Sequence, residues 1–154
     1  MVNGASMRIS LCAIVFLCFS NQLFAYCEGG KSSNLSIADE IKETSFIVIG
    51  TVTQQNLVVD PVEDPQGYEA VLFRVSVESI VYGKAPSYVS SEYLTLYTPN
   101  TSSRYQMEIG QKHLLFVSEG ADGFWINSCG NSTEYKKSKP IIQTIKSLVD
   151  GKDQ

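Results

Sequence analysis

Few residues of this chain combine the type and the spacing that catalysis or metal binding requires. The sequence has four cysteines but no C-x-x-C pair, one histidine at position 113, and no serine in a G-x-S-x-G turn. A catalytic nucleophile, a general base and a metal site each need several such groups held together. We therefore predict that the protein is not an enzyme, that it holds no cofactor or metal, and that His113 either packs within a strand or lies at an exposed strand edge.

Asp60, Glu63 and Asp64 form a cluster of carboxylates that could attract a calcium ion. The same stretch contains Pro61 and Pro65, and it has no glycine where a calcium-binding turn needs one. We therefore expect a solvated loop here.

The N-terminal 25 residues have the pattern of a secretory signal peptide. Arg8 precedes an apolar run over residues 9–19, and a small residue, Ala25, follows a short polar stretch. We predict cleavage after Ala25 and a secreted or periplasmic product. The apolar run is shorter than the roughly 20 residues that cross a bilayer, so no transmembrane segment is expected.

The mature chain, residues 26–154, has the length of one domain. Removing residues 1–25 takes away one basic residue, which leaves 11 Lys or Arg against 16 Asp or Glu. Nucleic-acid binding depends on clustered positive charge, so this acidic balance argues against a nucleic-acid partner. The basic cluster Lys136, Lys137 and Lys139 is interpreted as the solvated approach to a helix.

Cys27 and Cys129 are the two cysteines that remain after cleavage, and in an oxidising compartment their default state is a disulfide. A metal or redox pair is the alternative for both. A lipid anchor on Cys27 is a further alternative that would exclude the bridge, but Tyr26 disfavours it because a small residue should precede a lipidated cysteine.

Two helices are predicted, one at each end of the domain. Ser36 is a good N-cap for a short helix that ends near Thr44. The second helix is expected over residues 139–150, with Pro140 in its first turn and an apolar stripe along one side.

Five segments between the helices have the apolar or alternating pattern of strands. They span residues 46–53, 68–82, 93–98, 113–118 and 124–129. Gly50 predicts a bulge or a sharp bend in the first strand, and the glycines around residue 121 predict a hairpin turn. The fold class is therefore mainly β, with the strands in a small closed or partly closed barrel. An immunoglobulin-like sandwich would need about seven shorter strands.

The order of these signals resembles the netrin-like domain superfamily, which includes the tissue inhibitors of metalloproteinases. The resemblance rests on Cys27, on Phe46–Val52 after Ala38-Asp39, on Phe73–Gly83, on Gly110–Phe116 and on Cys129-Gly130-Asn131-Ser132. It implies one domain over residues 26–154, folded as a five-stranded oligonucleotide/oligosaccharide-binding (OB) barrel.

The resemblance implies a protein partner, with a metalloprotease as one candidate. The leading hypothesis is a non-enzymatic binding module that uses its N-terminal segment and neighbouring loops. The alternative is a metalloendopeptidase inhibitor in which the amine and carbonyl of a first-residue Cys27 bind the zinc of the target. That alternative requires cleavage after Tyr26, whereas cleavage after Ala25 leaves Cys27 second.

The candidate partner-binding residues are Tyr26, Cys27, Glu28, Tyr105 and Trp125. Tyr105 and one of the pair Phe124 and Trp125 are expected to be exposed. Asn34, Asn100 and Asn131 begin Asn-x-Ser/Thr sequons in predicted loops, and they could carry glycans if the protein is exported through a eukaryotic secretory pathway.

Overall fold

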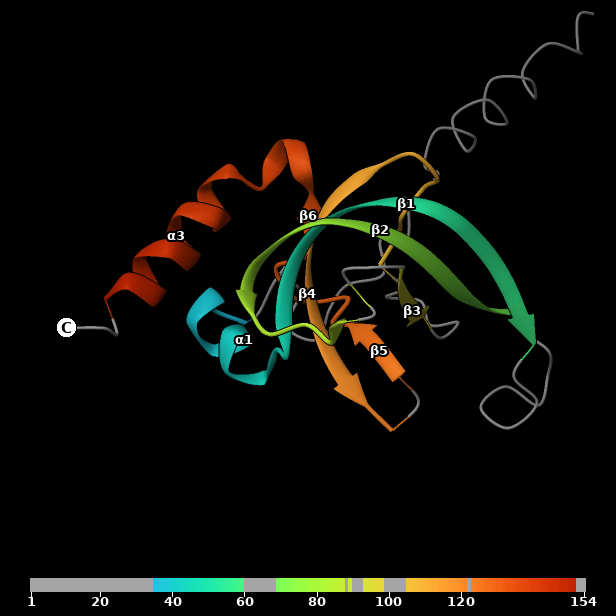
Figure 1. Cartoon of the computed structure of the whole chain (residues 1–154), viewed down its shortest axis with the longest axis horizontal. Coiled ribbons are helices and arrows are strands. Elements are labelled where there is room, and N and C mark those ends of the chain that lie inside the picture. The colour runs from blue at the N-terminus through green and yellow to red at the C-terminus, as the bar shows by residue number, and fades with distance from the viewer. Residues whose placement is uncertain are drawn as a thin grey trace, which may run out of the picture.

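The computed structural model describes residues 35–59, 69–87, 89, 93–98, 105–121 and 123–151. The described part is mainly β, with helices on one side of the sheet (Figure 1). Its elements in chain order are α1 (Ile37–Glu43), β1 (Phe46–Val59), β2 (Glu69–Gly83), β3 (Leu94–Thr98), β4 (Lys112–Gly120), β5 (Gly123–Ile126), β6 (Thr133–Glu134), the 3₁₀ turn η2 (Tyr135–Lys137) and α3 (Lys139–Asp150).

The strand pairings form a ring. The sheet order is β1-β2-β3-β5-β4-β6, and an additional antiparallel pairing joins β1 to β4. Strands β1, β2, β3, β5 and β4 therefore each have two neighbours, and the two-residue β6 is added beside β4. The pairing of β3 with β5 is parallel, whereas the others are antiparallel.

The two longest strands reach this arrangement by curving together (Figure 1). The β1–β2 register shifts at three places, one of them between Ile49 and Gly50, where a bend was predicted. A Cβ atom on Gly50 would lie 2.6 Å from the Val75 side chain and 2.8 Å from the Ser76 carbonyl oxygen. Only glycine lets the two strands approach this closely, because any other residue adds the atom that collides.

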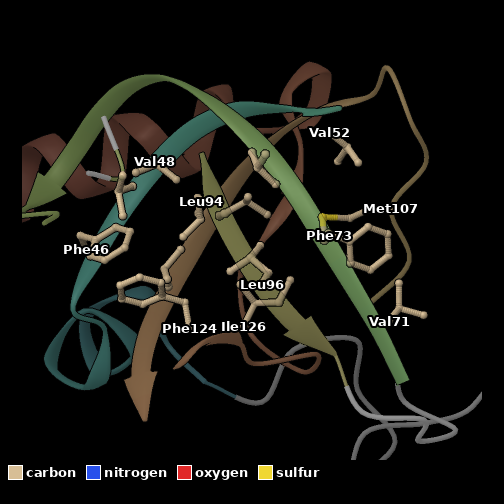
Figure 2. Close-up of a cluster of buried hydrophobic side chains, with 14 residues drawn as sticks. Phe46, Val48, Val52, Val71, Phe73, Leu94, Leu96, Met107, Phe124 and Ile126 are labelled. Atoms are coloured by element: carbon tan, nitrogen blue, oxygen red, sulfur yellow. The ribbon is translucent and has the colours of Figure 1, made fainter. Parts of the chain in front are cut away.

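The main core lies inside the ring of strands (Figure 2). Inward-facing residues of β1 to β5 supply it, and the alternation predicted for the second strand is confirmed because Val71, Phe73 and Val75 are buried. The Phe46 and Phe124 rings meet edge to face at 5.3 Å. Burial of each such large side chain is worth about 1.5–3 kcal/mol.

A second apolar cluster lies between the sheet and the two helices. Leu114 and Phe116 face outward from β4, whereas Leu115 and Val117 face the main core, so both sides of this strand are buried. Ile41 of α1 and Ile145 of α3 cover the outward pair. The predicted N-cap of α1 is confirmed, since the Ser36 hydroxyl oxygen accepts a hydrogen bond from the Asp39 amide.

The predicted elements agree with most of the described fold, but the ends of two strands were wrong and one short strand was not predicted. The first strand continues beyond residue 53 to Val59. The last strand ends at Ile126, so Cys129 lies in a turn after it and not on the strand. The short β6 was not predicted, because two paired residues leave no periodic pattern. The predicted signal peptide and the acidic loop of residues 60–64 lie outside the described residues. No described helix is long and apolar enough to cross a membrane.

Candidate functional site

Aromatic side chains gather on the outer face of β2, β3 and β5. Leu96 and Phe124 are register partners of β3 and β5, and both are buried in the main core. Their chain neighbours therefore point to the outside, because side chains alternate along a strand. We call this surface the Trp125 face, and it comprises Arg74, Tyr93, Thr95, Tyr97 and Trp125.

Trp125 is the single tryptophan of the chain, and 43% of its surface is exposed. Its neighbours Phe124 and Ile126 are each only 7% exposed. The expectation that one of Phe124 and Trp125 is exposed is therefore confirmed for Trp125. Gly120 leaves space beside the indole, since a Cβ atom there would lie 3.4 Å from its Nε1.

Arg74 and Tyr93 form a stacked pair on the same face. The guanidinium carbon lies 4.9 Å from the centre of the Tyr93 ring, within the range of a cation–π contact. Gln54 of β1 accepts a hydrogen bond from Nη1 of Arg74 at 3.3 Å. These contacts hold the guanidinium against the sheet, and Tyr93 remains 44% exposed. The site therefore presents partly preorganised side chains to solvent.

The predicted exposure of Tyr105 was wrong, because this side chain is half-buried. Its hydroxyl oxygen lies 3.0 Å from Nδ1 of His113, and its ring meets the imidazole edge to face. It also packs against the main core. The sequence could not indicate this contact, because the two residues lie on different segments and only the folded chain brings them together.

Burial controls the protonation of this pair. His113 is 1% exposed, and burial lowers its pKa, although the nearby negative charge of Glu134 acts in the opposite direction. Burial also raises the pKa of Tyr105, and Glu134 adds to that shift. Both groups are therefore neutral near pH 7. Nε2 of His113 is buried and has no hydrogen-bond partner among the described residues.

An enzyme hypothesis would require His113 to lie beside an acidic or hydroxyl group in a cleft. The hydroxyl is present, since Tyr105 supplies it, so the imidazole is not isolated on its strand. The ring is nevertheless almost completely buried. This burial favours a structural role for the pair.

A second buried polar contact joins α1 to the turn that contains Cys129. Glu40 is 3% exposed, and its Oε2 accepts hydrogen bonds from the backbone amide of Asn131 at 2.7 Å and from its side-chain amide at 2.6 Å. The same side-chain amide donates to the Leu35 carbonyl at 3.1 Å. Burial raises the pKa of Glu40, while the bonds from Asn131 act to lower it.

The contact between Glu40 and Asn131 lies close to Leu35, the first described residue. The disulfide between Cys129 and Cys27 stays a prediction, because Cys27 lies outside the described residues. Tyr26, Cys27 and Glu28 also lie outside the described residues. The structure therefore places two of the five predicted partner-binding residues, Tyr105 and Trp125, and it does not bring them together on one surface.

Sequence analysis missed the Arg74–Tyr93 pair. Both residues lie within predicted strands, residues 68–82 and 93–98. Their contact depends on the pairing of β2 with β3, which aligns Arg74 with Thr95. No local pattern specifies which two strands become neighbours.

Comparison with known proteins adds no relative, since neither a protein-family model nor a curated protein matches the sequence. Within the part of the chain that the structure describes, no three acidic, cysteine or histidine residues are grouped as a metal site would require. The function must therefore be argued from the surfaces of the molecule.

Proposed function

We propose that this protein is an exported, non-enzymatic binding module that recognises a protein partner through the Trp125 face. The proposal is carried by the exposed Trp125 and the stacked Arg74–Tyr93 pair, which lie on the same outer face of β2, β3 and β5. Tryptophan, tyrosine and arginine are the residues most enriched among those that dominate protein–protein binding energy. Of the exposed aromatic rings among the described residues, Tyr93 and Trp125 both lie on this face, whereas Tyr135 lies elsewhere.

We further propose that the domain is an OB-type barrel of the netrin-like class. The ring of five pairings in the order β1-β2-β3-β5-β4 supports this assignment, as does the parallel contact between β3 and β5. The export signal predicted before Tyr26 supports a secreted or periplasmic location. Inhibition of a metalloprotease through Cys27 stays a prediction, because nothing in the described residues bears on that segment.

The chemistry of the face suggests how a partner is recognised. The indole and phenol rings offer broad apolar surfaces, and each can also donate a hydrogen bond at its edge. Arg74 supplies a fixed positive charge with further donors, so a carboxylate on the partner can pair with it. We therefore expect an apolar contact at Trp125 accompanied by a polar contact at Arg74.

The single tryptophan makes a direct test possible. The mature protein is immobilised and used to isolate binding partners from its native extracellular or periplasmic fluid, and the purified partner is then titrated while Trp125 fluorescence is recorded. We expect a shift of the emission to shorter wavelength, because the partner removes water from the indole. Trp125→Ala and Tyr93→Ala should each weaken binding at least tenfold, measured by calorimetry.

Tyr135→Ala is the matched control, because Tyr135 is also 43% exposed but stacks with Lys112 beside β6. This variant should bind like the unmodified protein. Equal binding by all three alanine variants would refute the Trp125 face as the binding site. A purified partner that leaves the Trp125 emission unchanged would refute it as well.

A further inference from the structure

The outer half of β1 has one edge that none of the described strands pairs with. Residues 46–51 of this strand pair with β2 on one side and β4 on the other. Val52 ends the second pairing, since its amide donates to the Gln111 carbonyl and its carbonyl accepts from the Gly110 amide. From Gln54 to Val59 the strand is in regular register with β2, and no described residue pairs with its other side.

This edge is long and accessible. Six residues of an extended strand span about 20 Å, and alternate residues direct their N–H and C=O groups away from the paired neighbour. The side chains of residues 54–57 are all exposed, so neither surface of the sheet is covered there by described residues. In Figure 1 this end of the β1–β2 hairpin extends away from the helices.

The edge lacks the features that usually prevent strand addition. Natural edge strands carry charged residues, especially lysine, or proline at positions that face a possible neighbour. The sequence from Gln54 to Val59 is Gln-Gln-Asn-Leu-Val-Val, which contains neither. Leu57 is 59% exposed although its register partner Val71 is buried in the main core. An apolar side chain therefore lies on an edge whose outward backbone groups are paired by no described residue.

We propose that this edge pairs with the same edge of a second copy of the chain, antiparallel about a two-fold axis close to Leu57. A partner strand there satisfies the outward backbone groups of both copies. It also brings the two exposed leucines together, which removes apolar surface from water in each copy. This edge adjoins the Trp125 face at Gln54, which accepts a hydrogen bond from Arg74. Variants at Leu57 and at Trp125 change different side chains, so either proposal can fail without the other.

Two observations favour a second copy over an unrelated peptide. The chain has a net charge of −4, yet the edge itself is uncharged, so two copies can meet here without placing like charges against each other. In addition, a two-fold contact pairs this edge in both copies, so the assembly stops at a dimer. The paired segment is short, so we expect a weak dimer that dissociates on dilution.

Sedimentation velocity of the mature protein over a dilution series tests the proposal. We expect a reversible monomer–dimer equilibrium for the unmodified chain. Leu57→Lys and Leu57→Glu each place two like charges close to the axis and remove the apolar contact. Each should therefore weaken the dimer several-fold, because facing like charges on paired strands are unfavourable. A mixture of the two variants should recover association, because the charges are then opposite.

Ile80→Lys is the control, because Ile80 is also an exposed aliphatic residue of the hairpin but lies near the other end of β2. It should dimerise like the unmodified protein. Thermal melts of all variants check that each one folds. A protein that stays monomeric up to about 1 mM, where even weak binding is detected, overturns the proposal. A dimer that the Leu57 variants do not weaken overturns it too.

Discussion

The Tyr105 hydroxyl oxygen lies 3.0 Å from Nδ1 of His113, inside the ring of strands. His113 lies on β4 directly opposite Gly50 of β1, so the imidazole occupies an interior position where the facing residue has no side chain. A buried imidazole costs free energy unless its nitrogen atoms are hydrogen-bonded. Tyr105 therefore stabilises the interior of this domain.

Replacing Tyr105 with phenylalanine tests that contribution. The ring remains, but Nδ1 of His113 loses its partner, and we expect the free energy of unfolding to fall by about 1–3 kcal/mol. Urea denaturation of both proteins measures the change. Tyr135→Phe is the control, because its exposed hydroxyl should contribute less than about 0.5 kcal/mol. Equal stability of the Tyr105 variant and the unmodified protein would show that the hydrogen bond is unimportant.

His113 should make the stability depend on pH. Burial lowers its pKa in the folded state below the value of about 6.5 expected in the unfolded chain. Between these two values the unfolded chain binds a proton that the folded protein does not. The free energy of unfolding therefore falls as the pH drops below about 6.5, by at most about 1.4 kcal/mol for each pH unit.

The measurement is urea denaturation between pH 5 and pH 8, with His113→Gln as the comparison. Glutamine keeps a polar side chain beside Tyr105 but does not titrate. The part of the pH dependence due to His113 should therefore be absent in the variant. Identical profiles for the two proteins would contradict the lowered pKa of this histidine.

Gly50→Ala should be strongly destabilising. The added Cβ atom would lie 2.6 Å from Val75 Cγ1 and 2.8 Å from the Ser76 carbonyl, and the backbone atom cannot move without disturbing β2. We expect a loss of at least about 1–3 kcal/mol, the usual effect of overpacking a core. Thermal denaturation measures it. Gly120→Ala is the control, since its nearest contact would be 3.4 Å from the edge of Trp125.

Asn131→Ala should loosen the contact between α1 and the turn that contains Cys129. The substitution removes the side-chain donor to both Glu40 and the Leu35 carbonyl. Because a hydrogen bond to a charged group contributes about 1.5–3 kcal/mol, we expect a loss of that size in urea denaturation. Thr133→Ser is the control, because it changes a nearby residue but leaves the side-chain amide of Asn131 in place. An Asn131 variant of full stability would contradict the role assigned to this amide.

Nδ2 of Asn131 is the atom to which an N-linked glycan would be attached. Both of its hydrogens are directed at acceptors within the protein, so a glycan at Asn131 would break this contact. When the protein is exported from a eukaryotic host, mass spectrometry of the folded product should find Asn131 unmodified. A folded, fully stable protein with a glycan on Asn131 would refute the prediction.

The sequence by itself determined where most described strands and both helices lie. Alternating apolar residues predicted the buried face of β2, Ser36 predicted the start of α1, and Gly50 predicted the bend in β1. These features leave a local signal. Side-chain alternation and helix capping involve residues that are near one another in the chain, and the bend was predicted from a single glycine. The exposure of one residue of the Phe124–Trp125 pair also followed from alternation.

Only the tertiary structure decided which strands meet and which aromatic residues are exposed. Tyr105 lies in a segment without periodicity, and its burial depends on the distant His113. The stacking of Arg74 with Tyr93 depends on the pairing of β2 with β3, and the free edge of β1 depends on β4 pairing only as far as Thr51. These contacts join residues from separate elements, so their free energy depends on the whole arrangement of strands and leaves no local pattern in the sequence.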